Sequence, residues 1–365
     1  MKFFRILIIS LISFFLIIFI DFFFGKYILN YIFAYNKPII ENSVYHHDLK
    51  KNINKKHVYN KIYNYTLCTN EYGFKSDCEK KKISKKIDYA FIGDSFTEGV
   101  GLNFEDTFVG LFSENNKNKS IANLGVESYS PKIYYKKIKQ LLDNGFQFDR
   151  VIIFLDLGDI LDENAYFFDN GNLKRKSTIK FVNTVYQEYS NLYKLKKILK
   201  DKLPLGFLFY SSLGKINFKS NSEKKILQTL NIKDNYIIHS RWTYENEFSK
   251  KDEPWISNGI LESKIYLNKI YELSKENNFK LSLAIYPWPA QILFDDDTGR
   301  KKFGNIWKNF CIEKCEHFVN FLDKFHDLKS QIGKTDVAEK YYLKDDVHFN
   351  KKGNIFIFNH LKEIF

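Results

Sequence analysis

Two short segments of the chain carry residues that could act together as a nucleophile and its base. Ser95 follows an apolar run within Phe91-Ile-Gly-Asp-Ser-Phe-Thr-Glu-Gly99. A serine hydroxyl is a weak nucleophile unless a neighbouring base removes its proton. The candidate base is His348, and Asp345, three residues before it, is the candidate carboxylate that would hold the ring through Nδ1–H and stabilise the imidazolium. This combination predicts nucleophilic catalysis by a serine.

The elements that must position these residues are indicated by five short apolar runs that alternate with helical patterns. Such alternation is typical of a parallel sheet covered on both faces. The runs are residues 89–92, 121–124, 151–155, 281–285 and 318–322. Helices are expected after Ser130-Pro131, over 263–276, near 304–314 and after Asn350. We predict an α/β, doubly wound, five-stranded parallel sheet, whose carboxyl edge would gather the functional groups.

The motifs also resemble a known family. The residues that carry the resemblance are Gly93-Asp94-Ser95 with Thr97, Gly125, and Asp345 with His348. In this arrangement they resemble the SGNH (GDSL-type) hydrolases, from about residue 87 to the C-terminus. The resemblance implies a flavodoxin-like sheet, ester chemistry, Ser95 as the nucleophile, His348 as the base and Asp345 as its partner. It also implies that the backbone N–H groups of Ser95 and Gly125 bind the oxyanion.

One part of the family pattern is missing. The third family block is usually Gly-x-Asn-Asp, and its asparagine donates to the oxyanion. Here the segment reads Leu155-Asp-Leu-Gly-Asp159, which places Gly158 where the asparagine should stand. Losing one oxyanion donor typically costs about 3 kcal/mol of transition-state stabilisation. The backbone N–H of Gly158, or Asn123, is a candidate substitute, and the sequence does not choose between them.

The N-terminus carries the one long apolar run of the chain, residues 6–24. A helix needs about 20 such residues to cross a bilayer. Lys2 and Arg5 precede the run and favour a cytoplasmic N-terminus. A cleaved signal peptide is the alternative, but no Ala-x-Ala site lies near Gly25. We expect a single-pass anchor over 1–26, with the catalytic domain extracytoplasmic (periplasmic in a Gram-negative cell).

The rest of the chain divides into a stalk or preface and a main domain. Residues 27–86 are polar, aromatic and irregular, and we expect them to pack on an SGNH-type domain over 87–365. A long insertion is expected at about 160–259. Within it, the apolar stretch 203–213 is too short to span a membrane and could touch the membrane surface, line a substrate groove or pack in the core.

The four cysteines form two local pairs, Cys68 with Cys78 and Cys311 with Cys315. In an oxidising compartment each pair would close a short loop, so we predict two disulfides. Zinc is the alternative, with His317 near the second pair, but the spacing lacks a Cys-x-x-Cys knuckle. We therefore expect no metal and no cofactor.

Composition narrows the class of partner. Of 365 residues, 44% are hydrophobic and 27% charged, which excludes a disordered chain. The net charge is +13, but the lysines are scattered and are not interleaved with stacking aromatics, so no nucleic-acid partner is expected. A cationic surface suits an anionic bilayer or polysaccharide. Trp288 could stack on a sugar ring or pack a rigid loop.

Together these features predict a membrane-anchored serine hydrolase or O-acyltransferase. Its substrate would be an acylated saccharide, an acyl (expected acetyl) ester of a cell-envelope polysaccharide, and polysaccharide assembly proteins would be its partners. Water as the acceptor makes an esterase, and a sugar hydroxyl makes a transferase. The alternative is a non-catalytic glycan-binding or scaffold protein of the envelope, motivated by Gly158 in place of the family asparagine.

Overall fold

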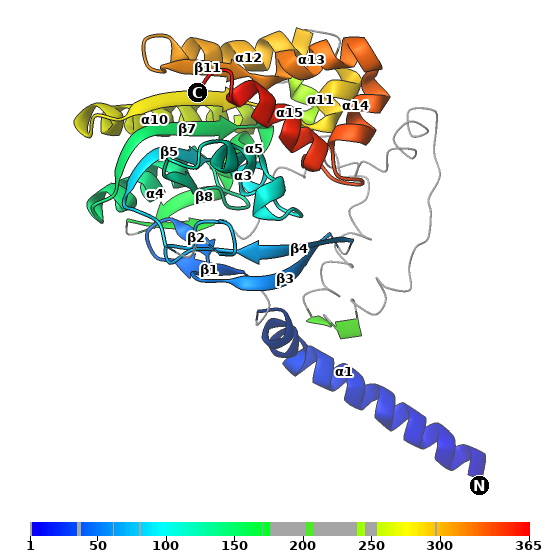
Figure 1. Ribbon diagram of the computed structural model, residues 1–365. Coiled ribbons are helices and arrows are strands. Elements are labelled where there is room, and N and C mark those ends of the chain that lie inside the picture. The colour runs from blue at the N-terminus through cyan, green and yellow to red at the C-terminus, as the bar shows by residue number, and fades with distance from the viewer. Residues whose placement is uncertain are drawn as a thin grey trace. The chain divides into compact units, whose positions relative to one another are not determined.

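The structure is a computed structural model (Figure 1). It describes residues 2–34, 38–60, 62–79, 82–169, 171–175, 202–203, 205–206, 239–244, 254–295 and 298–365. The chain forms two compact units, one of residues 39–177 with 222–365 and the other of residues 1–38 with 178–221.

A five-stranded parallel sheet forms the centre of the larger unit. Its strands, in spatial order, are β11 (His317–Asn320), β10 (Lys280–Ile285), β7 (Gln147–Leu155), β5 (Lys86–Ile92) and β6 (Ile121–Asn123). Every neighbouring pair is parallel. The first strand in the sequence therefore lies between the second and the third, which is the flavodoxin-like order. The predicted fold class is confirmed, and all five predicted runs contain a strand.

The chain order reverses between β5 and β7, so their carboxyl ends open a crevice where ligands bind in such sheets. The last five residues of β7 are buried because helices cover the sheet. One group of packed helices is α4 (Pro131–Asp143), α5 (Leu157–Ala165) and α10 (Pro254–Glu276). Another group contains α3 (Phe108–Asn115), α13 (Phe321–Ile332), α14 (Lys334–Tyr341) and α15 (Lys351–Leu361). The remaining elements of this region are α2 (Ser95–Glu98), η1 (Phe104–Asp106), α11 (Pro289–Phe294), α12 (Thr298–Cys311), η4 (Arg241–Thr243), β8 (Tyr166–Asp169) and β9 (Asn172–Arg175).

The fifth strand is shorter than the sequence suggested. Residues 321 and 322 belong to α13 because the side chain of Asn320 accepts the N–H of Leu322 and caps that helix. The rest of α13, together with α14, occupies a segment for which the sequence predicted no element.

Residues 39–79 are more regular than the sequence suggested. They contain two antiparallel hairpins, β1 (Ile39–Asn42) with β2 (His46–Leu49), and β3 (Asn54–Tyr59) with β4 (Tyr63–Cys68). Strand β3 has little apolar alternation, and most of its residues are exposed. Leu67 and Phe74, in contrast, are almost fully buried. The hairpins belong to the same compact unit as the sheet.

Helix α1 (Lys2–Ala34) is longer than the expected anchor. Its segment Phe4–Gly25 has a mean hydropathy of 2.9, and it is long and apolar enough to cross a membrane. Asp21 is buried, and its carboxylate accepts the N–H groups of Leu205 and Gly206 at 2.8 and 2.6 Å. Most of the expected insertion 160–259, including most of 203–213, lies outside the described residues.

Both predicted disulfides are present. Cys68 is joined to Cys78 and Cys311 to Cys315, with Cα–Cα distances of 5.0 and 4.9 Å. No cysteine remains free, so the sulfur ligands of the alternative zinc site are absent.

Candidate active site

Ser95 and His348 meet at the carboxyl edge of the sheet. Ser95 is the first residue of α2, directly after β5, and Asp94 caps this helix by accepting the N–H of Phe96. The Oγ of Ser95 lies 2.7 Å from Nε2 of His348, a residue 253 positions later in the sequence. Both residues are 8% exposed. The structure therefore brings together the nucleophile and the base that the sequence suggested.

The carboxylate beside His348 is Asp346, not Asp345. The Oδ1 of Asp346 accepts hydrogen bonds from Nδ1–H of His348 and, at 3.1 Å, from the backbone N–H of the same residue. Asp345 has a left-handed backbone (φ 62°), and no hydrogen bond joins it to the ring among the described residues. The prediction of Asp345 as the orienting residue was wrong, because the turn at Asp345 presents the following carboxylate to the histidine. Asp346, which we expected to be solvated, is instead 2% exposed.

The pair Asp346–His348 has the electrostatics of an oriented base. Burial lowers the pKa of His348, but the hydrogen bond and the charge of Asp346 outweigh burial, so the pKa is raised above its ordinary value. Burial raises the pKa of Asp346, and its bonds to His348 and Tyr59 reverse the effect, so this pKa is lowered. Asp346 therefore stays charged and stabilises a protonated His348.

The expected oxyanion donors are only partly available. The N–H of Gly125 donates to Oδ1 of Asn123 at 3.0 Å, and the N–H of Gly158 donates to Oδ1 of Asp156 at 2.6 Å. Asn123 also bonds within the protein: its Nδ2 uses one of its two N–H donors on the carbonyl of Thr97. Ser95 N–H, at the first position of α2, has no helical partner and remains the available donor of the three.

A side chain at position 158 would crowd both Asp156 and Trp288. A Cβ at Gly158 would lie 3.2 Å from the indole Cζ2 of Trp288 and 2.9 Å from Oδ1 of Asp156. The indole N–H donates to Oδ2 of Asp156 at 2.5 Å. The ring is only 6% exposed, so it packs the loop and offers little face to a sugar. The substrate-stacking interpretation of Trp288 is therefore not supported, and its packing interpretation is.

Three buried carboxylates lie beside the Ser95–His348 pair. Burial raises the pKa values of Asp94, Asp156 and Asp159, and the charge of Asp156 raises those of Asp94 and Asp159 further. Asp94 is in contact with the nucleophile, since its Oδ2 lies 3.3 Å from Oγ of Ser95. Its other oxygen accepts the hydroxyl of Tyr286 at 3.0 Å. The sheet edge is thus acidic, although the whole chain is basic.

The β3–β4 hairpin contributes to the site in a way that the sequence did not predict. The hydroxyl of Tyr59 and the Nδ2 of Asn60 each donate to Oδ2 of Asp346 at 3.2 Å. No sequence signal could have found these contacts, because they join positions nearly 290 residues apart in a segment without a motif. Among the described residues, no group of three or more His, Cys, Asp or Glu could hold a metal ion.

No protein-family model matches the chain, and no curated protein matches it. Three solved structures that resemble it are esterases. The psychrotrophic esterase of Pseudoalteromonas sp. is 12% identical over 77% of this chain and 96% of its own, with a TM-score of 0.39. An acetyl xylan esterase, AlAXEase, is 12% identical over 76% of this chain and 99% of its own, with a TM-score of 0.41. The acetylxylan esterase of Geobacillus stearothermophilus is 12% identical over 76% of this chain and 94% of its own, with a TM-score of 0.42.

Proposed function

We propose that this protein is a membrane-anchored SGNH-type serine hydrolase or O-acyltransferase that acts on acyl esters of a cell-envelope polysaccharide. The observation that carries the proposal is the chain of hydrogen bonds from Ser95 through His348 to Asp346. A serine hydroxyl in contact with an oriented imidazole is the arrangement that activates it for attack on an acyl carbonyl.

The reaction follows from this arrangement. His348 takes the proton of Ser95 as Oγ bonds to the acyl carbon, and Asp346 stabilises the resulting imidazolium. The N–H of Ser95 donates to the oxyanion. His348 then gives the proton to the departing sugar oxygen and leaves an acyl-enzyme. Water or a second sugar hydroxyl attacks this ester, and His348 takes the proton of the attacking group. The bond between the acyl carbon and Oγ then breaks, and His348 returns the proton to Oγ of Ser95.

The substrate and the location are supported by other features. The apolar segment of α1 suits an anchor, and two disulfides suit an oxidising compartment outside the cytoplasm. Two of the esterases that the chain resembles are acetyl xylan esterases. An extracytoplasmic enzyme tethered to a membrane would meet envelope glycans in that position.

A fluorophosphonate probe tests the proposal, because it labels a serine only when a base activates the hydroxyl. The full-length protein should label at Ser95 and hydrolyse a small aryl acetate. Ser95→Ala should lose both properties and keep its thermal unfolding midpoint. Ser84→Ala, which changes an exposed serine just before β5, should keep both. Labelling that persists in Ser95→Ala would remove Ser95 from the mechanism.

A non-catalytic glycan-binding or scaffold protein is the second candidate function. It is favoured by one observation, that the N–H groups of Gly125 and Gly158 already donate to neighbouring side chains. In that case the wild-type protein would not react with the probe and would still be retained by an acylated glycan or by envelope proteins.

A further inference from the structure

The carboxylate of Asp346 has hydrogen-bond donors on both of its oxygens. Oδ1 faces the ring and the backbone N–H of His348, and Oδ2 faces the N-terminal hairpin, where it accepts from Tyr59 and Asn60. A carboxylate held at one oxygen can rotate about its C–C bond. Donors on both oxygens fix the plane of the group, and with it the direction of the bond to the ring.

The two hairpin residues are themselves constrained. Tyr59 is the last residue of β3, and its hydroxyl also lies 3.2 Å from Nδ1 of His348. The rings of Tyr59 and His348 pack edge to face, with 5.6 Å between their centroids. Asn60 takes a left-handed backbone (φ 50°), which asparagine adopts more readily than most residues. Both donors therefore come from defined positions in the turn region of the hairpin.

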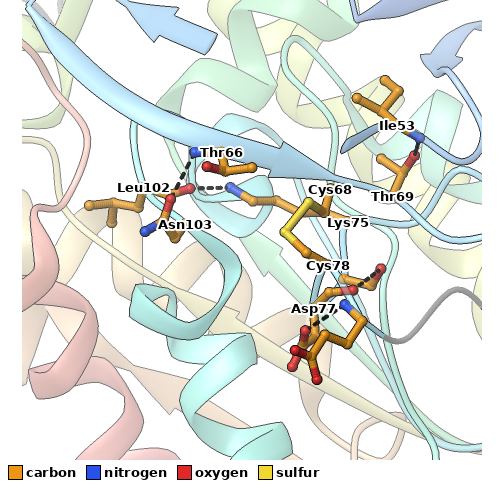
Figure 2. Close-up of a disulfide and its surroundings, with 11 residues drawn as sticks. Ile53, Thr66, Cys68, Thr69, Lys75, Asp77, Cys78, Leu102 and Asn103 are labelled. Carbon is orange, nitrogen blue, oxygen red and sulfur yellow. Dashed lines mark hydrogen bonds between the residues drawn. A yellow bond between two sulfur atoms is a disulfide. The ribbon is translucent and has the colours of Figure 1, made fainter. Parts of the chain in front are cut away.

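The other end of the hairpin is hydrogen-bonded to the segment that follows α2, the helix that begins at Ser95 (Figure 2). Cys68, which ends β4, is bonded to Cys78, and the loop between them carries Lys75. The buried ammonium of Lys75 donates to the carbonyls of Gly99 and Leu102 at 2.7 Å each. In addition, the N–H of Thr66 donates to Oδ1 of Asn103 at 2.8 Å. The hairpin thus spans from the turn after Ser95 to the loop that holds His348.

We infer that the β3–β4 hairpin is a positioning element of the active site, in which Tyr59 and Asn60 hold Asp346 against His348. The inference rests on the proposed function. A carboxylate released from these donors would spend less time in line with Nδ1, so the imidazole would be oriented less well and would be a weaker base. A misplacement of about 1 Å in such a site can cost up to about 100-fold in rate.

The test compares Tyr59→Phe/Asn60→Ala with Tyr271→Phe. The control removes a tyrosine hydroxyl on α10 whose bond to the carbonyl of Glu313 is long, at 3.5 Å. The rate of fluorophosphonate labelling of the full-length protein is measured from pH 5 to pH 9. We expect the plateau rate of the double variant to fall between about 10- and 100-fold.

The midpoint of the pH profile should also move, and to lower pH. A carboxylate that has drifted away stabilises the imidazolium less, so the pKa of His348 falls toward the value that burial favours. The other charged groups that act on His348 are unchanged in the variant: Asp94 after β5, Glu98 in α2, Glu127 after β6 and Asp156 after β7. A shift of the midpoint therefore reports the Asp346 contact.

Four outcomes are decisive. A lower plateau with a midpoint moved to lower pH supports the inference. An unchanged profile, or a lower plateau at an unchanged midpoint, overturns it, the second result meaning that the hairpin matters for structure only. Wild-type protein that does not label contradicts the proposed function instead. In that case the pKa of His348, measured by NMR of ¹⁵N-histidine-labelled protein, decides the inference: equal values in wild type and double variant overturn it.

Discussion

At the scale of single residues, the base of the active site depends on which of two neighbouring aspartates faces it. Asp346 is 2% exposed and accepts two hydrogen bonds from His348, whereas Asp345 occupies the left-handed turn before it. A difference of one position in the sequence therefore separates the carboxylate that orients the base from one that does not.

Asp346→Asn should lower the rate of aryl acetate turnover by about 10³- to 10⁴-fold, because an amide cannot hold the same tautomer or stabilise the imidazolium. Asp345→Asn is the matched control, and it should change the rate by far less. The measurement is kcat/KM for both variants, with thermal unfolding to confirm that each is folded. Equal losses in the two variants would contradict the assignment of Asp346.

The activity should depend on pH through His348. Asp346 raises the pKa of His348 above the ordinary value near 6.5, and only the neutral ring can accept the proton of Ser95. Turnover should therefore increase with pH, with a midpoint above pH 6.5. In Asp346→Asn the midpoint should move to lower pH, because the charge that stabilises the imidazolium is gone. A wild-type midpoint below 6.5 would argue against this electrostatic arrangement.

The sequence predicted the parts of the site that short segments determine. Ser95 at a strand-to-helix turn and His348 before the last helix could be identified from residue type, order and context. Trp288 and Gly158 could not be interpreted in the same way, because the indole that lies beside Gly158 and bonds to Asp156 comes from a segment 130 positions away. Packing between distant segments was the information that the local pattern lacked.

At the scale of elements, the five strands were predictable and the N-terminal hairpins were not. A strand of a parallel sheet is buried on both faces and appears as a continuous apolar run. Strand β3 is mostly exposed, and its polar residues give no such signal. The hairpin that contains it is instead stabilised by long-range bonds and by the Cys68–Cys78 disulfide.

Replacing Cys68 and Cys78 by alanine should lower the free energy of unfolding by about 2–3 kcal/mol, because the unfolded chain gains the entropy of an open loop of ten residues. Cys311→Ala/Cys315→Ala opens a loop of four residues and should lower the free energy of unfolding by less. Thermal unfolding of the two double variants measures the difference. If the second variant were the less stable one, the loop-length argument would fail.

At the scale of the whole molecule, the helix proposed as an anchor and the sheet belong to different compact units. The proposed anchor predicts that the full chain stays in the membrane fraction after washing at high pH, because the segment Phe4–Gly25 of α1 is long and apolar enough to span the bilayer. A chain that lacks residues 2–34 should be recovered in the soluble fraction. Release of the full chain by the alkaline wash would mean that α1 is not a stable membrane span.

The proposed positioning hairpin lies between this anchor and the first strand of the sheet, with both Cys68 and Cys78 on the anchor side of β5. In an anchored chain, a protease that cuts just before β5 would break the covalent link between hairpin and sheet, and the bonds of Thr66 and Lys75 to the sheet unit would still hold the two pieces together. Activity should therefore survive such a cut and be lost when these contacts are broken as well.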